Sequence, residues 1–367
     1  MKFKEVSITS DGLNVEFSNG IKDCFPFLWL RDHCKDDVNW DERSSQRKLF
    51  TALIDPNIKV SNVKIIQDSD ELEVKWPDME SAVLYSSKFL FQNSFGNSHV
   101  GNSLEVWDNI KISKNTIEID YSSLNKSSGF EGLLKIIKTF GFSVINNCPK
   151  DMSSVEFIAN KIGYVRNSIF GGLWSFESNS DMADSAYTQE ELRPHTDGTY
   201  NHDAPGLQLL LCCDYDAQGG ESIMVDGLKI AEEIQKNNKG CYNFLSEVDI
   251  PGRYYGDGVE LLAKRPVFRL NKQKEIIQVS FNNYDRADFR LPNDQISNFY
   301  SSIRTFDKIA NDKSMQWRKI LEPGQLLIFD NWRILHGRSE FSGKRRMSGC
   351  YINKEDFESA CRMYGIN

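Results

Sequence analysis

The sequence lacks long apolar runs, closely spaced cysteine pairs and any excess of basic residues. No stretch approaches the roughly 20 apolar residues that a membrane span requires, and the start, MKFKEVSITSDG, has no apolar signal core. The eight cysteines include no CxxC pair, which predicts reduced thiols in a cytoplasmic protein. A net charge of −8 provides no basic field for nucleic acid or an anionic membrane, so we expect a small-molecule partner.

The composition is that of a globular chain, with 40% hydrophobic and 26% charged residues. The segments VSITSDGLNVEF and VKIIQDSDELEVKW alternate around turn residues, which predicts β-hairpins in a small domain over residues 1–100. A Gly/Ser/Asn cluster, SFGNSHVGNS at 94–103, predicts a linker. We therefore expect a second, larger domain over residues 104–367.

The larger domain begins with helical patterns and continues with short strands. FEGLLKIIKTFG and SSVEFIANKIGYV have apolar residues at helical spacing, and Ser153 or Ser154 is the expected cap of the second helix. After residue 200 apolar segments such as GLQLLLCC, ESIMVDG and QLLIFDN dominate. Many short strands after a few helices predict a mainly β fold with helices (α+β), a sandwich or barrel with the helices outside.

One of only five histidines lies in RPHTDGTYNHDAPG, residues 193–206. His195 and Asp197 are two positions apart, and on an extended segment their side chains point the same way and can reach one ion. Such a pair also arises by chance, so a second histidine on another strand is needed. His336 is the candidate, because in LLIFDNWRILHGRSEF an apolar strand runs into a Gly-containing turn.

Two imidazoles and one carboxylate predict a particular metal chemistry. On one face of an octahedron they leave three positions open, as in non-haem Fe(II) oxygenases, whereas a structural zinc site needs four protein ligands. A 2-oxo acid fills two open positions and dioxygen the third. We therefore predict Fe(II) on His195, Asp197 and His336, with 2-oxoglutarate and dioxygen as co-substrates and ascorbate as a candidate reductant.

The distal carboxylate of 2-oxoglutarate needs a fixed cation, best supplied by an arginine on a strand near the second histidine. GKRRMSGCYI supplies Arg345 and Arg346, nine and ten residues after His336. In a strand these two side chains point to opposite faces. Arg345 shares its face with Gly349 and Tyr351 and is the predicted anchor.

Longer motifs surround these residues: HTDGTY, APGLQLL, GGESIMVDG, FNNYDRADF, FDNWRILHGRSEF and RRMSGCYINKEDF, with FPFLWLRDHC and EVKWPD nearer the N-terminus. Together they resemble the Fe(II)/2-oxoglutarate dioxygenases that hydroxylate γ-butyrobetaine and Nε-trimethyllysine, over nearly the whole chain. The resemblance implies a double-stranded β-helix (jelly-roll) domain, iron on His195, Asp197 and His336, 2-oxoglutarate on Arg345, and a homodimer. It also places Ser222 on the same carboxylate, although a strand-end hydroxyl bonded to backbone explains that residue equally well.

The small N-terminal domain departs from the family pattern. Members of the family hold a zinc there with three closely spaced cysteines and a histidine. In this chain only Cys34 remains, while Asp36 and Asn39 stand near the other cysteine positions and Glu80 near the histidine. We therefore predict that this domain binds no zinc.

A trimethylammonium group has no N–H to donate, so a protein holds it mainly through aromatic faces. By resemblance Phe170, Trp174, Tyr187 and Tyr351 match such a cage, with Phe170 in place of a tyrosine. Ordinary core packing is the alternative for each of them taken alone.

The opposite end of the substrate distinguishes the relatives. Asp184, in DMADSAYT, stands where the butyrobetaine enzyme has an asparagine and the trimethyllysine enzymes a similar aspartate. A carboxylate there would repel butyrobetaine but pair with an α-ammonium. Asn283 and Arg286, in FNNYDR, would then receive the α-carboxylate; a solvated loop is the alternative for Asp184.

The preferred interpretation is hydroxylation of Nε-trimethyllysine to a 3-hydroxy product. Two other quaternary ammonium substrates stay open: γ-butyrobetaine, with carnitine as product, and 2-(trimethylammonio)ethylphosphonate. Asn201 favours the phosphonate, because its amide together with Arg286 would bind phosphonate oxygens. A non-catalytic jelly-roll binding protein is the alternative of another class.

Overall fold

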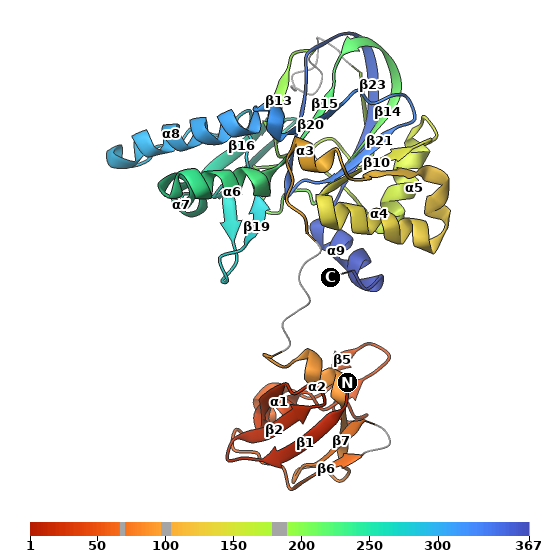
Figure 1. Cartoon of the computed structure of the whole chain (residues 1–367), viewed down its shortest axis with the longest axis vertical. Coiled ribbons are helices and arrows are strands. Elements are labelled where there is room, and N and C mark those ends of the chain that lie inside the picture. The colour runs from red at the N-terminus through yellow and green to blue at the C-terminus, as the bar shows by residue number, and fades with distance from the viewer. Residues whose placement is uncertain (67–69, 97–103, 178–188, 367) are drawn as a thin grey trace. The chain divides into compact units, whose positions relative to one another are not determined.

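The computed structural model describes residues 1–66, 70–96, 104–177 and 189–366. It divides into two compact units, Met1–Asn102 and Ser103–Asn367 (Figure 1). The division falls within the Gly/Ser/Asn-rich stretch 94–103. Within the described ranges, no helix has the length and apolar character needed to cross a membrane.

The N-terminal unit contains two three-stranded antiparallel sheets. One is β1 (Phe3–Ile8), β2 (Gly12–Phe17) and β3 (Lys22–Pro26); the other is β6 (Asn62–Ile66), β7 (Glu71–Lys75) and β8 (Val83–Ser86). The hairpin β4 (Trp40–Asp41) and β5 (Gln46–Arg47) and helices α1 (Phe27–Asp32) and α2 (Ser87–Gln92) complete it. The hairpin predicted from VSITSDGLNVEF is confirmed. A Cβ at Gly12 would lie 2.3 Å from the Phe25 carbonyl oxygen, so glycine lets β2 and β3 approach closely.

The residues that resemble zinc-ligand positions form hydrogen bonds within this unit. The buried Cys34 sulfur lies 2.9 Å from the Tyr85 hydroxyl oxygen. The Arg31 guanidinium donates to the Asn39 amide oxygen at 3.2 Å and pairs with Asp78 at 2.8 Å. Protein partners therefore satisfy these groups, while the expected absence of zinc stays a prediction.

The C-terminal unit contains two antiparallel-rich sheets with the architecture of a jelly roll, which confirms the predicted fold class. The larger sheet has the order β11 (Val165–Arg166), β23 (Phe341–Ile352), β14 (Leu207–Gly219), β21 (Leu326–Asp330), β10 (Phe142–Asn146) and β9 (Glu118–Asp120), with β12 (Trp174–Glu177) paired to β23. The smaller sheet has the order β13 (Leu192–His195), β22 (Ile334–Arg338), β15 (Ser222–Asp226) and β20 (Gln316–Lys319). Two hairpins flank them: β16 (Ile250–Gly256) with β17 (Val259–Arg265), and β18 (Phe268–Leu270) with β19 (Ile276–Val279).

Helices cover the outer faces of the two sheets (Figure 1). The larger sheet packs on α4 (Ser127–Phe140), α5 (Met152–Ile162) and α9 (Lys354–Met363) through one apolar cluster. The smaller sheet packs on α6 (Gly227–Asn237), α7 (Lys239–Glu247) and α8 (Asn293–Ala310) through another. The short helix α3 (Asn109–Ile112) contributes to a third cluster, which contains residues from both sheets.

Strand alternation explains which residues enter the space between the sheets. In β22, Leu335 belongs to the helix-covered cluster, whereas Ile334 belongs to the cluster between the sheets. His336 has the same parity as Ile334 and therefore faces the interior. In β23 the same alternation sends Cys350 to the helices and Met347 inward.

Two local predictions need correction. Helix α5 is capped by Asp151, whose carboxylate accepts from the Ser153 backbone N–H at 2.9 Å, and not by Ser153 or Ser154. Gly337 lies inside β22 and not in a turn. A Cβ there would lie 2.6 Å from the Leu192 carbonyl oxygen, so glycine is required by the close pairing of β13 and β22.

Candidate active site

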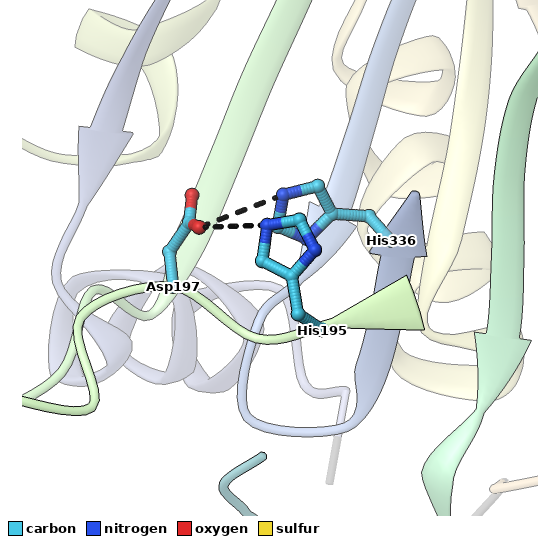
Figure 2. Close-up of side chains that lie close together, drawn as sticks. All are labelled: His195, Asp197 and His336. Carbon is cyan, nitrogen blue, oxygen red and sulfur yellow. Dashed lines mark ion pairs between the residues drawn. The ribbon is translucent and has the colours of Figure 1, made fainter. Parts of the chain in front are cut away.

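The two predicted histidines face each other across neighbouring strands. His195 ends β13 and is the register partner of His336 in β22. Asp197 follows β13, and its Oδ1 lies 3.5 Å from the His195 Nε2 and 3.6 Å from the His336 Nε2 (Figure 2). The three donor atoms lie within 4.8 Å of one another. Among the described residues, no other group of three His, Cys, Asp or Glu side chains has this proximity.

The side chain of Asn331 holds the backbone of Asp197 in place beside the two imidazoles. The Asn331 side chain accepts from the Asp197 backbone N–H at 2.8 Å and donates to its carbonyl oxygen at 3.0 Å. The same amide donates to the Pro205 carbonyl oxygen at 2.9 Å. Asn331 therefore fixes both ends of the loop that carries Asp197.

Neighbouring groups orient the ligand atoms. The His195 Nδ1 lies 2.8 Å from the Arg193 carbonyl oxygen and donates to it. The lone pair of the other ring nitrogen, Nε2, is then available to a metal. The Tyr351 hydroxyl donates to the Asp197 Oδ2 at 2.7 Å, which leaves Oδ1 toward the histidines. The His336 ring packs against Phe329, with ring centroids 4.8 Å apart. Partners of this kind typically fix the tautomer and raise metal affinity.

Electrostatics keep Asp197 and His336 in the state that binds a cation, whereas the pKa of His195 is raised, because hydrogen bonding and the negative charge of Asp197 together outweigh the effect of burial. Burial alone would raise the pKa of Asp197, but the adjacent His336 and His195 hold that pKa well below its usual range. Burial lowers the pKa of His336 to about 4, against the opposing effect of Asp197. At neutral pH the site thus offers an ionised carboxylate and a neutral imidazole. Two nitrogens and one oxygen in this arrangement fit a ferrous ion with open positions.

The trio lies in a cleft of the C-terminal unit. Its polar lining includes Ser222, Arg338, Arg345 and Asp285, and its apolar lining includes Leu210, Met224 and Met347. A cleft with an apolar lining and a few converging polar groups is typical of a small-molecule site.

Two arginines approach this cleft from different strands. Arg345, in β23, is only 8% exposed, and its guanidinium makes no hydrogen bond or ion pair with any described residue. Its neighbour Arg346 points to the outside and pairs with Asp214 at 2.5 Å. Arg338, in β22, is the register partner of Ser222. Burial lowers the pKa of Arg338 to about 10, and the charge of Arg345 contributes.

Three predicted cage residues line the same cleft. Trp174 lies in β12, with its ring centroid 5.8 Å from that of Tyr351 in β23. Phe170 completes the set, and Phe176, two residues after Trp174, also lines the cleft. Tyr187 and Asp184 lie outside the described residues.

The remaining predicted contacts lie in adjoining cavities. Asn201 lines a second cavity that shares Phe170 and Tyr351 with the cleft. Asn283 and Arg286 line a third cavity, which touches the cleft through Asn282. The structure thus brings these three residues near the site without placing them in the cleft itself.

Sequence reasoning missed three residues that the structure places in or around the site: Asn331, Arg338 and Asp285. Asn331 and Arg338 had a detectable signal, since each is a polar residue close to the apolar run around His336. Asp285 had none, because its position in the cleft depends on how the 281–289 segment folds back.

Comparison with known proteins agrees with this geometry. Residues 106–351 match the family described as "Taurine catabolism dioxygenase TauD, TfdA family", and residues 5–91 match "Gamma-butyrobetaine hydroxylase-like, N-terminal". A trimethyllysine dioxygenase of Meyerozyma guilliermondii is 31% identical over 388 residues, covering 100% of this chain and 96% of that protein. A gamma-butyrobetaine dioxygenase of Pseudomonas sp. is 28% identical, covering 95% and 93%.

A solved structure shares the fold of the C-terminal unit. It is a Burkholderia xenovorans protein assigned to the alpha-ketoglutarate-dependent taurine dioxygenases, with a TM-score of 0.51 and 11% identity over 65% of this chain and 90% of that chain. The family match covers more than half of the sequence, including His195, Asp197 and His336. The chain belongs to the TauD/TfdA family and is an Fe(II)- and 2-oxoglutarate-dependent dioxygenase.

Proposed function

We propose that this dioxygenase hydroxylates Nε-trimethyllysine at an aliphatic carbon, giving the 3-hydroxy product. The carrying observation is a single cleft that contains both the His195–Asp197–His336 trio and the aromatic residues Phe170, Trp174 and Tyr351. Its likeness to trimethyllysine dioxygenases over the full chain supports the same substrate. In the overall reaction one oxygen atom enters the substrate C–H bond, the other enters succinate, and 2-oxoglutarate loses CO₂.

In the metal site, some residues bind the ion and others orient those ligands. His195, Asp197 and His336 hold the ion, which when bound supplies the oxidising power by activating dioxygen. Tyr351 and the Arg193 carbonyl keep the ligand atoms aimed at it. The residues that line the cleft position the reacting carbon beside the metal.

The arginine end of the cleft fits the co-substrate. Arg345 is buried and makes no contact with an acidic described residue, so the distal carboxylate of 2-oxoglutarate can neutralise it. Ser222 lies close by in the smaller sheet and is the predicted second donor. Arg338 adds positive charge to the same end and favours a dicarboxylate over a monocarboxylate co-substrate. Ascorbate as a reductant stays a prediction.

The aromatic end fits the cation. The faces of Trp174, Phe170 and Tyr351 each contribute about 0.5–2 kcal/mol to binding a quaternary ammonium group. Tyr187 is the predicted fourth face. The four contacts position the substrate by its methylated end, and the length of the aliphatic chain then selects which carbon is oxidised.

The head group of the substrate carries an α-ammonium, which pairs with Asp184. Asp285 supports it, because this second carboxylate lines the cleft and disfavours a substrate whose head carries only negative charge. γ-Butyrobetaine is the second candidate, supported by the Pseudomonas relative. The phosphonate stays a third prediction, while intact ligand positions argue against a non-catalytic jelly roll.

The test is a comparison of kcat/KM for the three trimethylammonium compounds, with succinate formation as the readout. Asp184→Asn should reduce kcat/KM for trimethyllysine by about 10- to 100-fold, the effect of losing a charged hydrogen bond, and leave butyrobetaine unaffected. Equal losses on all three compounds would contradict the assignment of Asp184. A wild-type preference for the phosphonate would overturn the proposed substrate. Cytoplasmic location and the homodimer stay predictions.

A further inference from the structure

A small cavity lies behind the loop that carries Asp197. Its walls come from strand β16 and from Thr199, Arg265, Val267, residues 280–283, Arg286 and Ile303. Strand β16 approaches closely, since a Cβ at Gly252 would lie 2.5 Å from the Thr199 Oγ1. Two arginines, Arg265 and Arg286, line this cavity together.

Arg265 is buried without a counterion. It is 7% exposed, and its Nη2 donates to the carbonyl oxygens of Asn201 and His202. Its Nη1 is buried and has no hydrogen-bond partner among the described residues. Asp203 is the acid that acts on it electrostatically, but Asp203 pairs with Arg166 at 2.9 Å. Burying an unpaired guanidinium is costly, and a neutral water can satisfy its N–H but not its charge.

Arg286 adds a second positive charge to the same cavity. Its buried Nε has no hydrogen-bond partner, and its side chain forms no ion pair with a described residue. Its guanidinium lies over the Phe299 ring, 5.5 Å from the centroid. A bridge between Gly252 and Arg286 fixes the backbone beside the cavity. Arg265 and Arg286 thus line one small cavity, and each has a buried N–H group without a hydrogen-bond partner among the described residues.

We propose that this cavity binds a small monovalent anion, a carboxylate or a halide, between Arg265 and Arg286. The buried Ser280 lies on the same wall and supplies a neutral hydroxyl to it. Because Arg265 also holds the carbonyls of Asn201 and His202, the bound anion stabilises the loop that carries the metal ligand Asp197. The anion has two sources, a free ion or the α-carboxylate of the substrate, and only the second rests on the proposed function.

Bromide is the probe for the site. We expect sodium bromide, exchanged for sodium gluconate at constant ionic strength, to raise the Tm of the full-length protein with a saturable dose response. Crystals soaked in bromide should show an anomalous peak between Arg265 and Arg286. No peak there, or no Tm response beyond that of gluconate, would overturn the proposal.

Variants separate this site from a general salt effect. Arg286→Met should weaken bromide binding at least tenfold, and Arg265→Lys, which keeps the charge and protects folding, should weaken it less. Arg253→Met is the matched control, because Arg253 is an exposed arginine in β16 that pairs with Glu260 at 2.9 Å. An identical bromide response in Arg286→Met and Arg253→Met would contradict the proposal.

A second measurement identifies the natural source of the anion. The Kd of trimethyllysine and of its carboxylate-free counterpart, 5-(trimethylammonio)pentylamine, is measured with and without bromide. If the α-carboxylate occupies the cavity, bromide competes with trimethyllysine alone and Arg286→Met weakens trimethyllysine alone. If a free ion occupies it, bromide leaves both Kd values unchanged. Should trimethyllysine not be a substrate at all, the bromide peak still tests the anion site by itself.

Discussion

The space between the two sheets has an apolar part and a polar part, and the same strands supply both. The apolar part contains Trp107, Phe142 and Phe329, which are fully buried. The polar part contains the proposed metal ligands His195, Asp197 and His336, with Arg338 and Arg345. In β22, Ile334 belongs to the apolar part, and His336 and Arg338 follow it on the same face. Along β22, a residue of the apolar core and a residue of the active-site cleft are therefore only two positions apart.

The two parts differ in how their burial is compensated. Apolar side chains gain free energy simply by leaving water, so Phe142 needs only tight neighbours. A buried arginine or carboxylate must find an opposite charge or a metal, or it destabilises the fold. The polar part thus exists at a cost that a bound metal and co-substrate offset.

The largest expected effect comes from removing a ligand at the polar end. His336→Ala leaves two ligands, so Fe(II) binding and succinate formation coupled to dioxygen uptake should fall below detection. His202→Ala is the matched control, because His202 is exposed and lies outside the trio. Turnover by His336→Ala at the rate of that control would disprove the iron assignment.

Stability should respond most strongly at the apolar end. Phe142 is fully buried, and its ring lies 5.3 Å from that of Trp107 and 5.1 Å from that of Trp317. Phe142→Ala should lower the free energy of unfolding by about 3–5 kcal/mol, measured by urea denaturation. Tyr164→Ala, at a side chain that is 79% exposed, should change it by less than about 0.5 kcal/mol. Similar losses in both variants would show that the cluster is not a packed core.

The adjacent arginines Arg345 and Arg346 of β23 allow a buried charge in the cleft to be compared with one outside it. Arg345→Met should raise the KM for 2-oxoglutarate by about 10- to 100-fold, because a charged hydrogen-bond donor is lost from the cleft. Arg345→Lys should recover part of the loss, since it keeps the charge but not the fork. Arg346→Met removes only the outer pair with Asp214 and should leave this KM unchanged. The reverse ranking would mean that the strand enters the cleft in the other register.

The smallest effect is expected at Tyr351, whose hydroxyl binds Asp197 and whose ring lines the aromatic end of the cleft. Tyr351→Phe keeps the aromatic face but loses the hydrogen bond to the Asp197 Oδ2. We expect metal affinity to fall about tenfold, the effect of a partner that orients a ligand, measured with Co(II) as the probe. The Kd of the quaternary ammonium substrate, measured at saturating metal, should not change. A weaker substrate Kd with normal metal affinity would assign Tyr351 to the cage alone.

The sequence predicted the elements whose signal is local. The helix ending at Gly141 and the strand FSVIN appear as α4 and β10, because apolar spacing and a glycine in a left-handed conformation mark them directly. The cap of α5 was wrong by two or three residues, since Asp151, Ser153 and Ser154 all carry a suitable side-chain oxygen. Choosing among them depends on the backbone angles at the helix start.

His195, Asp197, His336 and Arg345 suggested an iron and 2-oxoglutarate chemistry because each brings a donor group that this chemistry needs, and the longer motifs around them gave the stronger prediction through their resemblance to a known family. The tertiary structure decided which side chains meet. It paired His195 with His336 across two strands, aimed the Tyr351 hydroxyl at Asp197, and brought Arg265 and Arg286 to one cavity from segments separated in sequence. Strand register and loop closure set these distances, and neither is encoded in the spacing of any single motif.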